Sequence, residues 1–203
     1  LEDAPFQPFA GIYKTTMIAN SHPDSNFRLK QLLLAVTQVY ASTFSEQARM
    51  IISTSPHLQE EEKMAVILQH LVGNSYANRF YPDFSGVAQS YNYYPVSPLK
   101  SSDGIAYVTL GLGRAVVEGY RALSFSPAYP QNLFQFSSTA YALNNSQRDF
   151  LALNLESSAV PQRAGALDNL LTLDLHCAES DGTLQSLGST YSREDDRIYD
   201  GVS

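Results

Sequence analysis

A glycine-rich segment, Gly111-Leu112-Gly113, is the first candidate for a ligand-binding loop. It follows the β-rich residues 105–110, and glycines at the end of a strand let the backbone turn sharply or approach a ligand closely. A dinucleotide-binding loop would need a third glycine, but Val116 occupies that position and no βαβ pattern follows. The segment therefore predicts a sharp turn or a close backbone approach, and by itself it does not predict a dinucleotide site.

The spacing of histidine and cysteine predicts neither a metal site nor a covalent nucleophile. The four histidines are His22, His57, His70 and His176. Their spacing is not that of metal ligands, and we expect most of them on the surface or in loops. His70 is notable because it follows Gln69 at the end of an expected strand. Cys177 carries no local nucleophile signature and is expected to be a buried or passive thiol, and no GxSxG elbow is present, so catalytic residues stay unknown.

Three closely spaced tyrosines, Tyr91, Tyr93 and Tyr94, could stack on nucleic-acid bases. The chain has 13 basic and 20 acidic residues, a net charge of -7 and no basic run, whereas binding to a phosphate backbone uses clustered Lys and Arg. We therefore expect core or interface tyrosines and no nucleic-acid partner. A few well-placed cations can still hold a small anion. No apolar stretch approaches the roughly 20 residues that span a bilayer, so no membrane partner is expected.

A chain of 203 residues is the size of one globular domain, or of one domain with a small appendage. Hydrophobic residues make up 44% and charged residues 16%, which provides for a core and argues against extended disorder. The single cysteine fits a reducing compartment, so we expect a cytoplasmic protein. The chain begins Leu1-Glu2-Asp3 without an initiator methionine or signal peptide and ends abruptly at Ser203, so we expect a fragment of a longer polypeptide.

The most regular helical pattern covers residues 26–50, after the candidate N-caps Asp24 and Ser25. Apolar residues recur there at three- and four-residue steps, at Leu29, Leu33, Val36, Tyr40 and Phe44. Such a stripe on one face is typical of an amphipathic helix. We expect this helix to pack its stripe against the core.

Several further segments are expected to be strands: residues 64–69, 105–110, 122–125 and 171–176, and a strand that includes residues 85–88. The first is almost continuously apolar and too short for a typical helix, which predicts a strand buried on both faces. Gly86 leaves room in its strand for a close backbone approach. The alternation of leucines with polar residues over 171–176 predicts a half-buried strand.

The last third of the chain is expected to be less regular. Residues 131–169 are polar, with a helical patch at 138–153, and Ser180-Asp181-Gly182-Thr183 predicts a hairpin-type turn whose second strand starts at Leu184. Helices with interleaved strands predict an α+β fold, with mixed or antiparallel sheet and packing helices. We expect a main segment over residues 1–150 and a partly β extension over residues 151–203.

Four segments in order along the chain resemble motifs of one known family, the PEP/pyruvate-binding (nucleotide-binding) domain of phosphoenolpyruvate synthase and pyruvate phosphate dikinase. The sequences LED at residues 1–3 and FAGIYKT at 9–15 resemble its LED…FAGxxxT segment. MAVILQHLV at 64–72 is similar to its MAVVVQxMV strand, SGVA at 85–88 matches its SGVA, and GLGRAVVEG at 111–119 is similar to its GLGExVVxG. Each motif alone is weak, and their order over residues 1 to about 130 is what makes the resemblance specific.

The resemblance implies an ATP-grasp fold, in which ATP lies between two α+β lobes. In that family ATP, with Mg²⁺, phosphorylates a histidine on a separate swivelling domain, and the phosphoryl group then reaches pyruvate. The ligands and partners implied are therefore ATP, Mg²⁺ and, through other domains, pyruvate or phosphoenolpyruvate. Gly11 would let backbone N–H groups approach the phosphates, and Thr15 would donate a hydroxyl hydrogen bond.

The adenine would lie at the end of the expected strand 64–69. The resemblance implies that Gln69 leads into a hinge, where the backbone groups of His70, Leu71 and Val72 read the adenine edge and apolar neighbours sandwich the ring. Chemistry in such a site is mainly positioning and charge neutralisation rather than covalent work by side chains.

Arg114 is the main departure from the family pattern, because it stands where the family has the Glu of GLGE. A guanidinium only donates hydrogen bonds and cannot accept them from ribose hydroxyls. Either Arg114 contacts phosphate instead, or this lobe binds nucleotide differently or poorly. The family's N-terminal Lys, its RSS arginine, its metal-binding Glu and its terminal Gln and Arg have no counterpart within the 203 residues, so we expect these residues alone to be inactive.

Two functions stay open on these residues. The first is an ATP-binding segment of a kinase or phosphotransferase of the dikinase type. The second is a non-catalytic regulatory or interaction module that kept the lobe and lost the site, with Arg114 and the tyrosines at 91–94 as its motivation.

Overall fold

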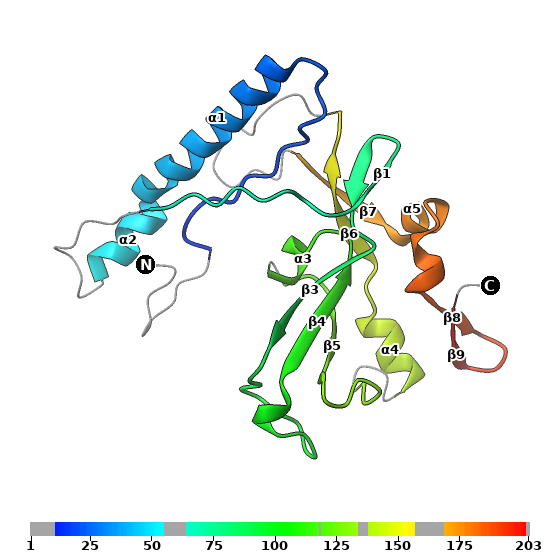
Figure 1. The fold of residues 1–203 in the computed structure, drawn as a ribbon. Coiled ribbons are helices and arrows are strands. Elements are labelled where there is room, and N and C mark those ends of the chain that lie inside the picture. The colour runs from blue at the N-terminus through cyan, green and yellow to red at the C-terminus, as the bar shows by residue number, and fades with distance from the viewer. Residues whose placement is uncertain (1–10, 55–63, 118, 134–137, 157–168, 202–203) are drawn as a thin grey trace. The chain divides into compact units, whose positions relative to one another are not determined.

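The computed structural model describes residues 11–54, 64–117, 119–133, 138–156 and 169–201. The chain forms two compact units (Figure 1). Unit 1 comprises Leu1–Leu71 and Leu153–Leu170, and unit 2 comprises Val72–Ala152 and Leu171–Ser203. The chain therefore passes from one unit to the other after residues 71, 152 and 170.

Unit 1 contains the helical part of the chain, as α1 (Ser25–Ala41), the 3-10 turn η1 (Ser42–Phe44) and α2 (Glu46–Thr54). Asp24 is the N-cap, as predicted, and its Oδ1 accepts a hydrogen bond from the Asn26 backbone N–H at 2.9 Å. The expected single helix over 26–50 is wrong in its continuity. Hydroxyl groups explain the break: Ser42 Oγ donates to the Val39 carbonyl, and Ser45 Oγ accepts from the Ala48 N–H to start α2.

The apolar stripe of α1 does not lie in a core. Leu29 is 53% exposed, Leu33 57% and Phe44 76%, whereas Gln31 and Ala35 are buried. The expectation of a core-packed stripe is therefore wrong. Periodicity defines which side chains share a helix face, but it does not determine which face meets the rest of the chain.

Two distant stretches of sequence are joined within unit 1. The Ser21 hydroxyl donates to the Leu155 carbonyl at 3.0 Å, and Asn169 Nδ2 donates to the Met17 carbonyl at 3.0 Å. Asn169 is itself buried. These bonds tie the segment before α1 to the part of unit 1 that returns after residue 152.

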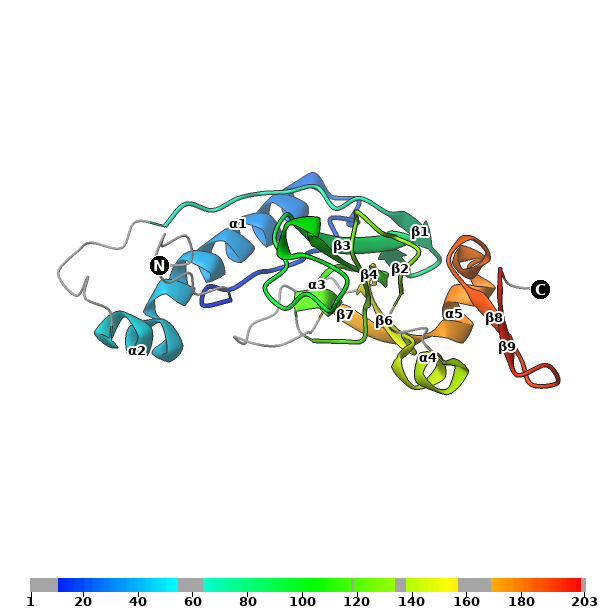
Figure 2. The ribbon, with the colours of Figure 1, turned by 90° about the horizontal axis from the view of Figure 1, so that it is seen from below.

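Unit 2 contains the sheets, apart from the last two residues of β6 and the first residue of β7, which belong to unit 1. A four-stranded sheet has the order β1-β2-β6-β7, with β1 (Asn74–Tyr76), β2 (Arg79–Tyr81), β6 (Asp149–Asn154) and β7 (Leu170–Asp174). A three-stranded antiparallel sheet comprises β3 (Phe84–Gln89), β4 (Ile105–Leu110) and β5 (Leu123–Phe125), with β3 and β4 side by side in both views (Figures 1 and 2). A separate hairpin is formed by β8 (Ser189–Ser192) and β9 (Arg197–Asp200).

Short helices connect these strands: η2 (Ser101–Asp103), α3 (Arg114–Val117), α4 (Thr139–Asn145), α5 (Leu175–Ser180) and η4 (Thr183–Ser186). Helices and largely antiparallel sheets occur in the same chain, so the predicted α+β class is confirmed. The expected strands over 105–110 and 122–125 and the strand containing residues 85–88 correspond to β4, β5 and β3.

The core of unit 2 is built around β6. Tyr81, Phe150, Ala152 and Ala178 are all 0% exposed and cluster with Leu110. The Tyr81 and Phe150 rings lie 4.8 Å apart between centroids. The helical patch expected over 138–153 is therefore wrong after residue 145, because a short apolar run reads the same way in a buried strand as in a buried helix.

The strand expected over residues 64–69 is wrong. These residues have no regular secondary structure, and Ile67 is 80% exposed and Leu68 63% exposed. A strand needs a neighbour to pair with its backbone groups, and none of the sheets described includes this segment. The apolar composition of residues 64–69 carries no information on whether a partner strand lies beside them.

The hairpin expected at residues 180–183 is also wrong. The preceding strand ends at Asp174, whose side chain accepts from the Cys177 N–H at 3.1 Å and caps α5. Residues 180–183 then form the end of α5 and the start of η4, with Gly182 in the left-handed region at φ 79°. The C-terminal hairpin is β8–β9 instead.

In the part of the chain that the structure describes, the helices are too short or too polar to cross a membrane.

Candidate functional site

Gly111-Leu112-Gly113, called the glycine turn from here on, follows the last residue of β4. The backbone conformation at Gly111 requires glycine. Gly111 has φ 80°, and a Cβ added there would lie 2.6 Å from the Leu151 carbonyl oxygen and 2.9 Å from Phe150 Cδ2. Gly111 forms a parallel bridge with Leu151, and the Leu112 N–H donates to the Leu151 carbonyl at 2.9 Å. The predicted sharp turn with close backbone approach is confirmed, and the backbone it approaches is β6.

Two of the four family-like segments meet at the glycine turn. β3, which carries SGVA, pairs with β4 so that Ser85 lies opposite Thr109. The Ser85 hydroxyl donates to the Gly111 carbonyl at 2.7 Å, and a Cβ added at Gly113 would lie 3.1 Å from Ser85 Cβ. In the same strand a Cβ at Gly86 would clash with the Tyr107 carbonyl oxygen, which confirms the predicted close approach.

Arg114 follows the glycine turn directly as the first residue of α3. Its side chain is half-buried, whereas the neighbouring Ala115 is fully buried. The Ala115 N–H donates to the Leu112 carbonyl at 3.2 Å and the Val116 N–H to the Gly113 carbonyl at 3.0 Å. The position of Arg114 is therefore determined by the turn that precedes it.

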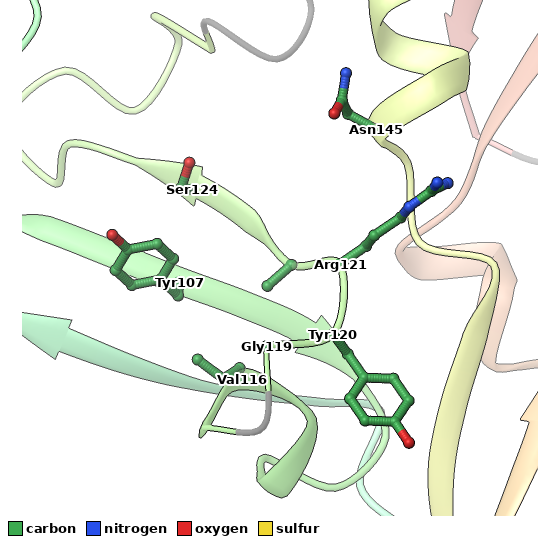
Figure 3. Close-up of a pocket in the computed structure, with 8 residues that line it drawn as sticks. Tyr107, Val116, Gly119, Tyr120, Arg121, Ser124 and Asn145 are labelled. Carbon is green, nitrogen blue, oxygen red and sulfur yellow. The ribbon is translucent and has the colours of Figure 1, made fainter.

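A shallow pocket of about 330 Å³ lies next to this motif (Figure 3). Val116 and Gly119 of the motif line it, together with polar side chains of Tyr107, Arg121, Ser124 and Asn145. Tyr107 and Ser124 are paired in the β4–β5 register. Arg121 extends toward Asn145 and donates to the Ser146 carbonyl at 3.5 Å.

Sequence reasoning missed these pocket residues. Tyr107 and Ser124 could have been placed on one face from the alternation of the two strands. Arg121 follows the glycine-rich motif by two residues, and that position next to a candidate ligand loop was the available signal. Asn145 had none, because it comes from α4.

Gly11 and Thr15 lie in unit 1, and both are exposed. Gly11 has φ 83°, and a Cβ added there would meet no described atom within 4 Å. Between them Lys14 is held against the helices: its N–H donates to Ser42 Oγ at 2.9 Å, and its Nζ donates to Gln38 Oε1 at 3.0 Å. Residues 1–3, 9 and 10 of the resembling segment lie outside the described residues.

The expected hinge at Gln69 and the three residues expected to read adenine, His70, Leu71 and Val72, fall on the boundary between the units. Gln69, His70 and Leu71 belong to unit 1, and Val72 begins unit 2. Gln69 and His70 are exposed, Leu71 is half-buried, and Val72 is 82% exposed. They form an irregular segment rather than the end of a strand, and their role stays a prediction. Arg114 lies in unit 2 with Val72.

The described residues do not fit a Mg²⁺ site. Magnesium is held through carboxylate oxygens, and the described part of the chain contains no group of three or more His, Cys, Asp or Glu side chains placed to hold a metal ion. We therefore assign no step to a metal held by these residues.

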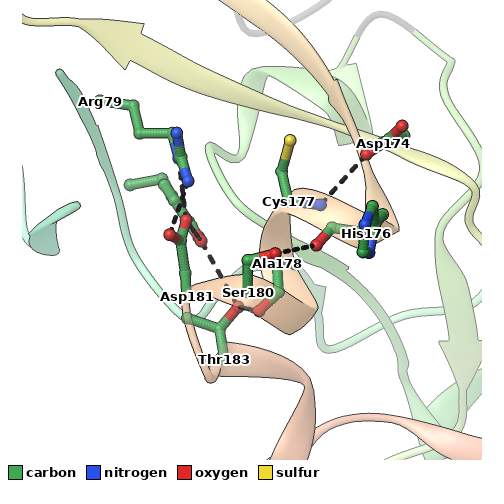
Figure 4. Close-up of polar contacts among 9 residues, drawn as sticks. Arg79, Asp174, His176, Cys177, Ala178, Ser180, Asp181 and Thr183 are labelled. Atoms are coloured by element: carbon green, nitrogen blue, oxygen red, sulfur yellow. Dashed lines mark hydrogen bonds and ion pairs between the residues drawn. The ribbon is translucent and has the colours of Figure 1, made fainter. Parts of the chain in front are cut away.

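A second polar cluster in unit 2 connects β2 to α5 (Figure 4). Arg79 donates to Asp181 through Nε at 2.9 Å and through its terminal nitrogen at 2.6 Å, and the Tyr81 hydroxyl donates to Asp181 Oδ2 at 2.6 Å. The hydrogen bonds from Arg79 hold the pKa of the Asp181 carboxyl below its usual range. Burial, and then the bond to Asp181, raise the pKa of the Tyr81 phenol, so its proton stays in place. These three side chains thus bind one another, and the cluster acts as a structural clamp.

Comparison with family models gave one match, to the pyruvate phosphate dikinase AMP/ATP-binding domain, over residues 1–141. Comparison with curated proteins gave no match. Comparison with solved structures gave none either. The matched residues include β3, β4, the glycine turn and α3, and they make up more than half of the chain. The resemblance expected from the sequence is thus confirmed, and the chain belongs to the family of the pyruvate phosphate dikinase AMP/ATP-binding domain.

Proposed function

We propose that this chain is the ATP-binding segment of a phosphotransferase of the dikinase type. In this proposal an ATP-grasp-like arrangement holds ATP, a histidine on another domain accepts the phosphoryl group, and pyruvate receives it afterwards. The observation that carries the proposal is the family match over residues 1–141, together with the pairing of SGVA and the glycine turn in one sheet. We place the parent polypeptide in the cytoplasm, where its ATP would be supplied.

The proposed contacts come from three parts of the chain. Gly11 and Thr15, both exposed, would offer backbone N–H groups and a hydroxyl to the phosphates. Gln69 would lead into the hinge, and the backbone of residues 70–72 would read the adenine edge. Arg114 would bind phosphate rather than ribose, because a guanidinium has no acceptor.

The 203 residues alone are expected not to transfer a phosphoryl group. Phosphoryl transfer depends on neutralising the charge of the triphosphate, and the described residues hold no candidate Mg²⁺ site. We therefore assign binding to this segment and place the acceptor histidine and the metal ligands elsewhere in the parent. Incubation with Mg-ATP tests this, and robust ADP or AMP formation would contradict it.

Calorimetric titration of the chain with ATP and with AMP tests the binding itself. Gly11→Ala and Thr15→Val are each expected to weaken ATP binding by about tenfold. The first places a methyl group where the backbone N–H groups would approach the phosphates, and the second removes the hydroxyl that would donate a hydrogen bond to them. Gly182→Ala is the matched control: Gly182 has φ 79° against 83° for Gly11, and both positions open onto free space. Unchanged ATP affinity in both site variants would argue against the proposal.

A specific observation also supports the second candidate, a non-catalytic interaction module. Tyr93 is 73% and Tyr94 89% exposed, on a loop ordered by Asn92, whose N–H donates to the Ser101 carbonyl at 2.8 Å and whose Oδ1 accepts from the Tyr94 N–H at 2.9 Å. Arg114→Glu separates the two candidates. A change of ATP affinity in this variant would count against the module, whether it is a loss through the missing phosphate contact or a gain through a restored ribose acceptor. A chain that binds no ATP with either residue would favour the module.

A further inference from the structure

The side chain of Gln147 takes the place of a strand at the end of β4. Its Oε1 accepts from the Leu110 N–H at 2.9 Å, and its Nε2 donates to the Leu110 carbonyl at 3.1 Å. A carboxamide that bonds both backbone groups of one residue reproduces what a neighbouring strand would provide. Leu110 is only 7% exposed, so its polar groups need partners within the protein.

The strand that Gln147 replaces is β5. β5 pairs with β4 over Ala106, Tyr107 and Val108. The Gly111 carbonyl faces β3, where it accepts from Ser85, and backbone groups alternate in direction along a strand, so those of Leu110 point away from β3 to the β5 side. β5 begins at Leu123 and does not extend to this level. Gln147 therefore completes the β5 side of β4 at the residue before the glycine turn.

Gln147 also joins the turn to β6. Its Nε2 donates to the Asp149 carbonyl at 2.9 Å, at the start of the strand whose Leu151 carbonyl accepts from Leu112 N–H. On the other side, the Ser85 hydroxyl holds the Gly111 carbonyl. The glycine turn is thus fixed between β3 and β6, and Gln147 connects the last β4 residue to β6.

We propose that Gln147 is a positioning residue for the nucleotide site: its carboxamide sets the direction in which β4 enters the glycine turn, and thereby the place of Arg114. This inference rests on the proposed function, in which Arg114 contacts the nucleotide. Gln147 lies beyond the residues 1–141 that match the family model, so the match does not assign it a role.

The carboxamide is needed as both donor and acceptor, and two variants remove these properties differently. Gln147→Glu keeps the size but places a carboxylate, which cannot donate, next to the Leu110 and Asp149 carbonyl oxygens. Gln147→Met keeps the length and removes the hydrogen bonds. Gln185, an exposed residue of η4, provides the matched control as Gln185→Glu.

The experiment measures ATP affinity by calorimetry and the hydrogen exchange of residues 110–113, on the full 203-residue chain. We expect both Gln147 variants to bind ATP about tenfold more weakly and to exchange faster at Leu110 and Leu112, with the control unchanged. We also expect Gln147→Glu to regain ATP affinity as the pH falls toward about 4.3, because a protonated carboxyl can donate again. Gln147→Met should show no such recovery, because its side chain has no group that protonation could turn into a donor.

The outcomes separate this inference from the function on which it rests. Unchanged exchange at Leu110 and Leu112 in both variants would overturn the positioning role. Loss of cooperative unfolding in both variants would also overturn it, because Gln147 would then support the whole fold rather than the turn. If the wild-type chain binds no ATP, the proposed function fails, and the exchange of residues 110–113 alone decides whether Gln147 positions the turn.

Discussion

Asp181 is the residue on which the clamp between β2 and α5 depends. Replacing it by Asn removes the charge that pairs with Arg79, whose side chain is only 20% exposed. We expect Asp181→Asn to lower the free energy of unfolding by about 2 kcal/mol, the usual range for hydrogen bonds to a charged group. Tyr81→Phe, which leaves the Arg79–Asp181 pair intact, should cost about 1 kcal/mol. Urea denaturation measures both, and an equal or larger loss in Tyr81→Phe would contradict the assignment.

The same carboxyl makes stability depend on pH. Its folded pKa lies below its unfolded pKa, first because of the hydrogen bonds from Arg79. The stabilisation is therefore present above the unfolded pKa of about 3.9 and is lost as the pH falls through the folded pKa. We expect the stability difference between wild type and Asp181→Asn to be constant from pH 5 to 7 and to shrink below about pH 4. Thermal melts across this range measure it, and a difference that does not change down to pH 2 would contradict the prediction.

At the scale of elements, the junction of β4 and β6 depends on a glycine with no room for a side chain. Gly111 and Gly182 share nearly the same φ, at 80° and 79°, but only Gly111 faces backbone at 2.6 Å. We expect Gly182→Ala to cost about 1 kcal/mol from backbone strain alone. Gly111→Ala should cost about 3 kcal/mol, because overpacking against Leu151 adds to the same strain. Chemical denaturation measures the free energy of unfolding of the two variants. Equal losses would contradict the prediction, because they would mean that β6 moves to accept the added Cβ with no loss of stability.

The sequence predicted the elements that rely on local signals. The Asp24 cap, the strands β3 and β4, and the sharp turn at Gly111 were all predicted from neighbouring residues. It could not predict the loss of the strand at 64–69 or the buried strand β6, because strand formation depends on partners far along the chain.

The same limit applies to the site. The glycine turn was visible in the sequence, but Gln147 contacts Leu110 across 37 positions, and nothing in the local pattern of Gln147 signals that contact. The predicted nucleotide residues Gly11, Thr15, Gln69, His70, Leu71, Val72 and Arg114 were taken from motifs, and their division between two units is a property that motifs do not encode.

At the scale of the whole molecule, the family match ends at residue 141, but the core of unit 2 includes residues that come later in the chain. Phe150, Ala152 and Ala178 are fully buried, and all three lie after that point. We therefore expect a chain cut to residues 1–141 to lose cooperative unfolding of unit 2, since it would lack the strand that the glycine turn contacts. Circular dichroism during thermal melting tests this. A sharp transition in the shortened chain, comparable with that of the 203-residue chain, would contradict it.

The three passages of the chain between its units have a consequence for limited proteolysis. A nick after Leu71 would give two peptides, yet unit 1 would still contain pieces of both, because Leu153–Leu170 belongs to it. Val72 is 82% exposed, which makes that peptide bond accessible to a protease. The Ser21–Leu155 and Met17–Asn169 hydrogen bonds would then join the two peptides without a covalent link. The cleaved protein should therefore migrate as one species in its native state and separate only in denaturant, as complementing fragments do.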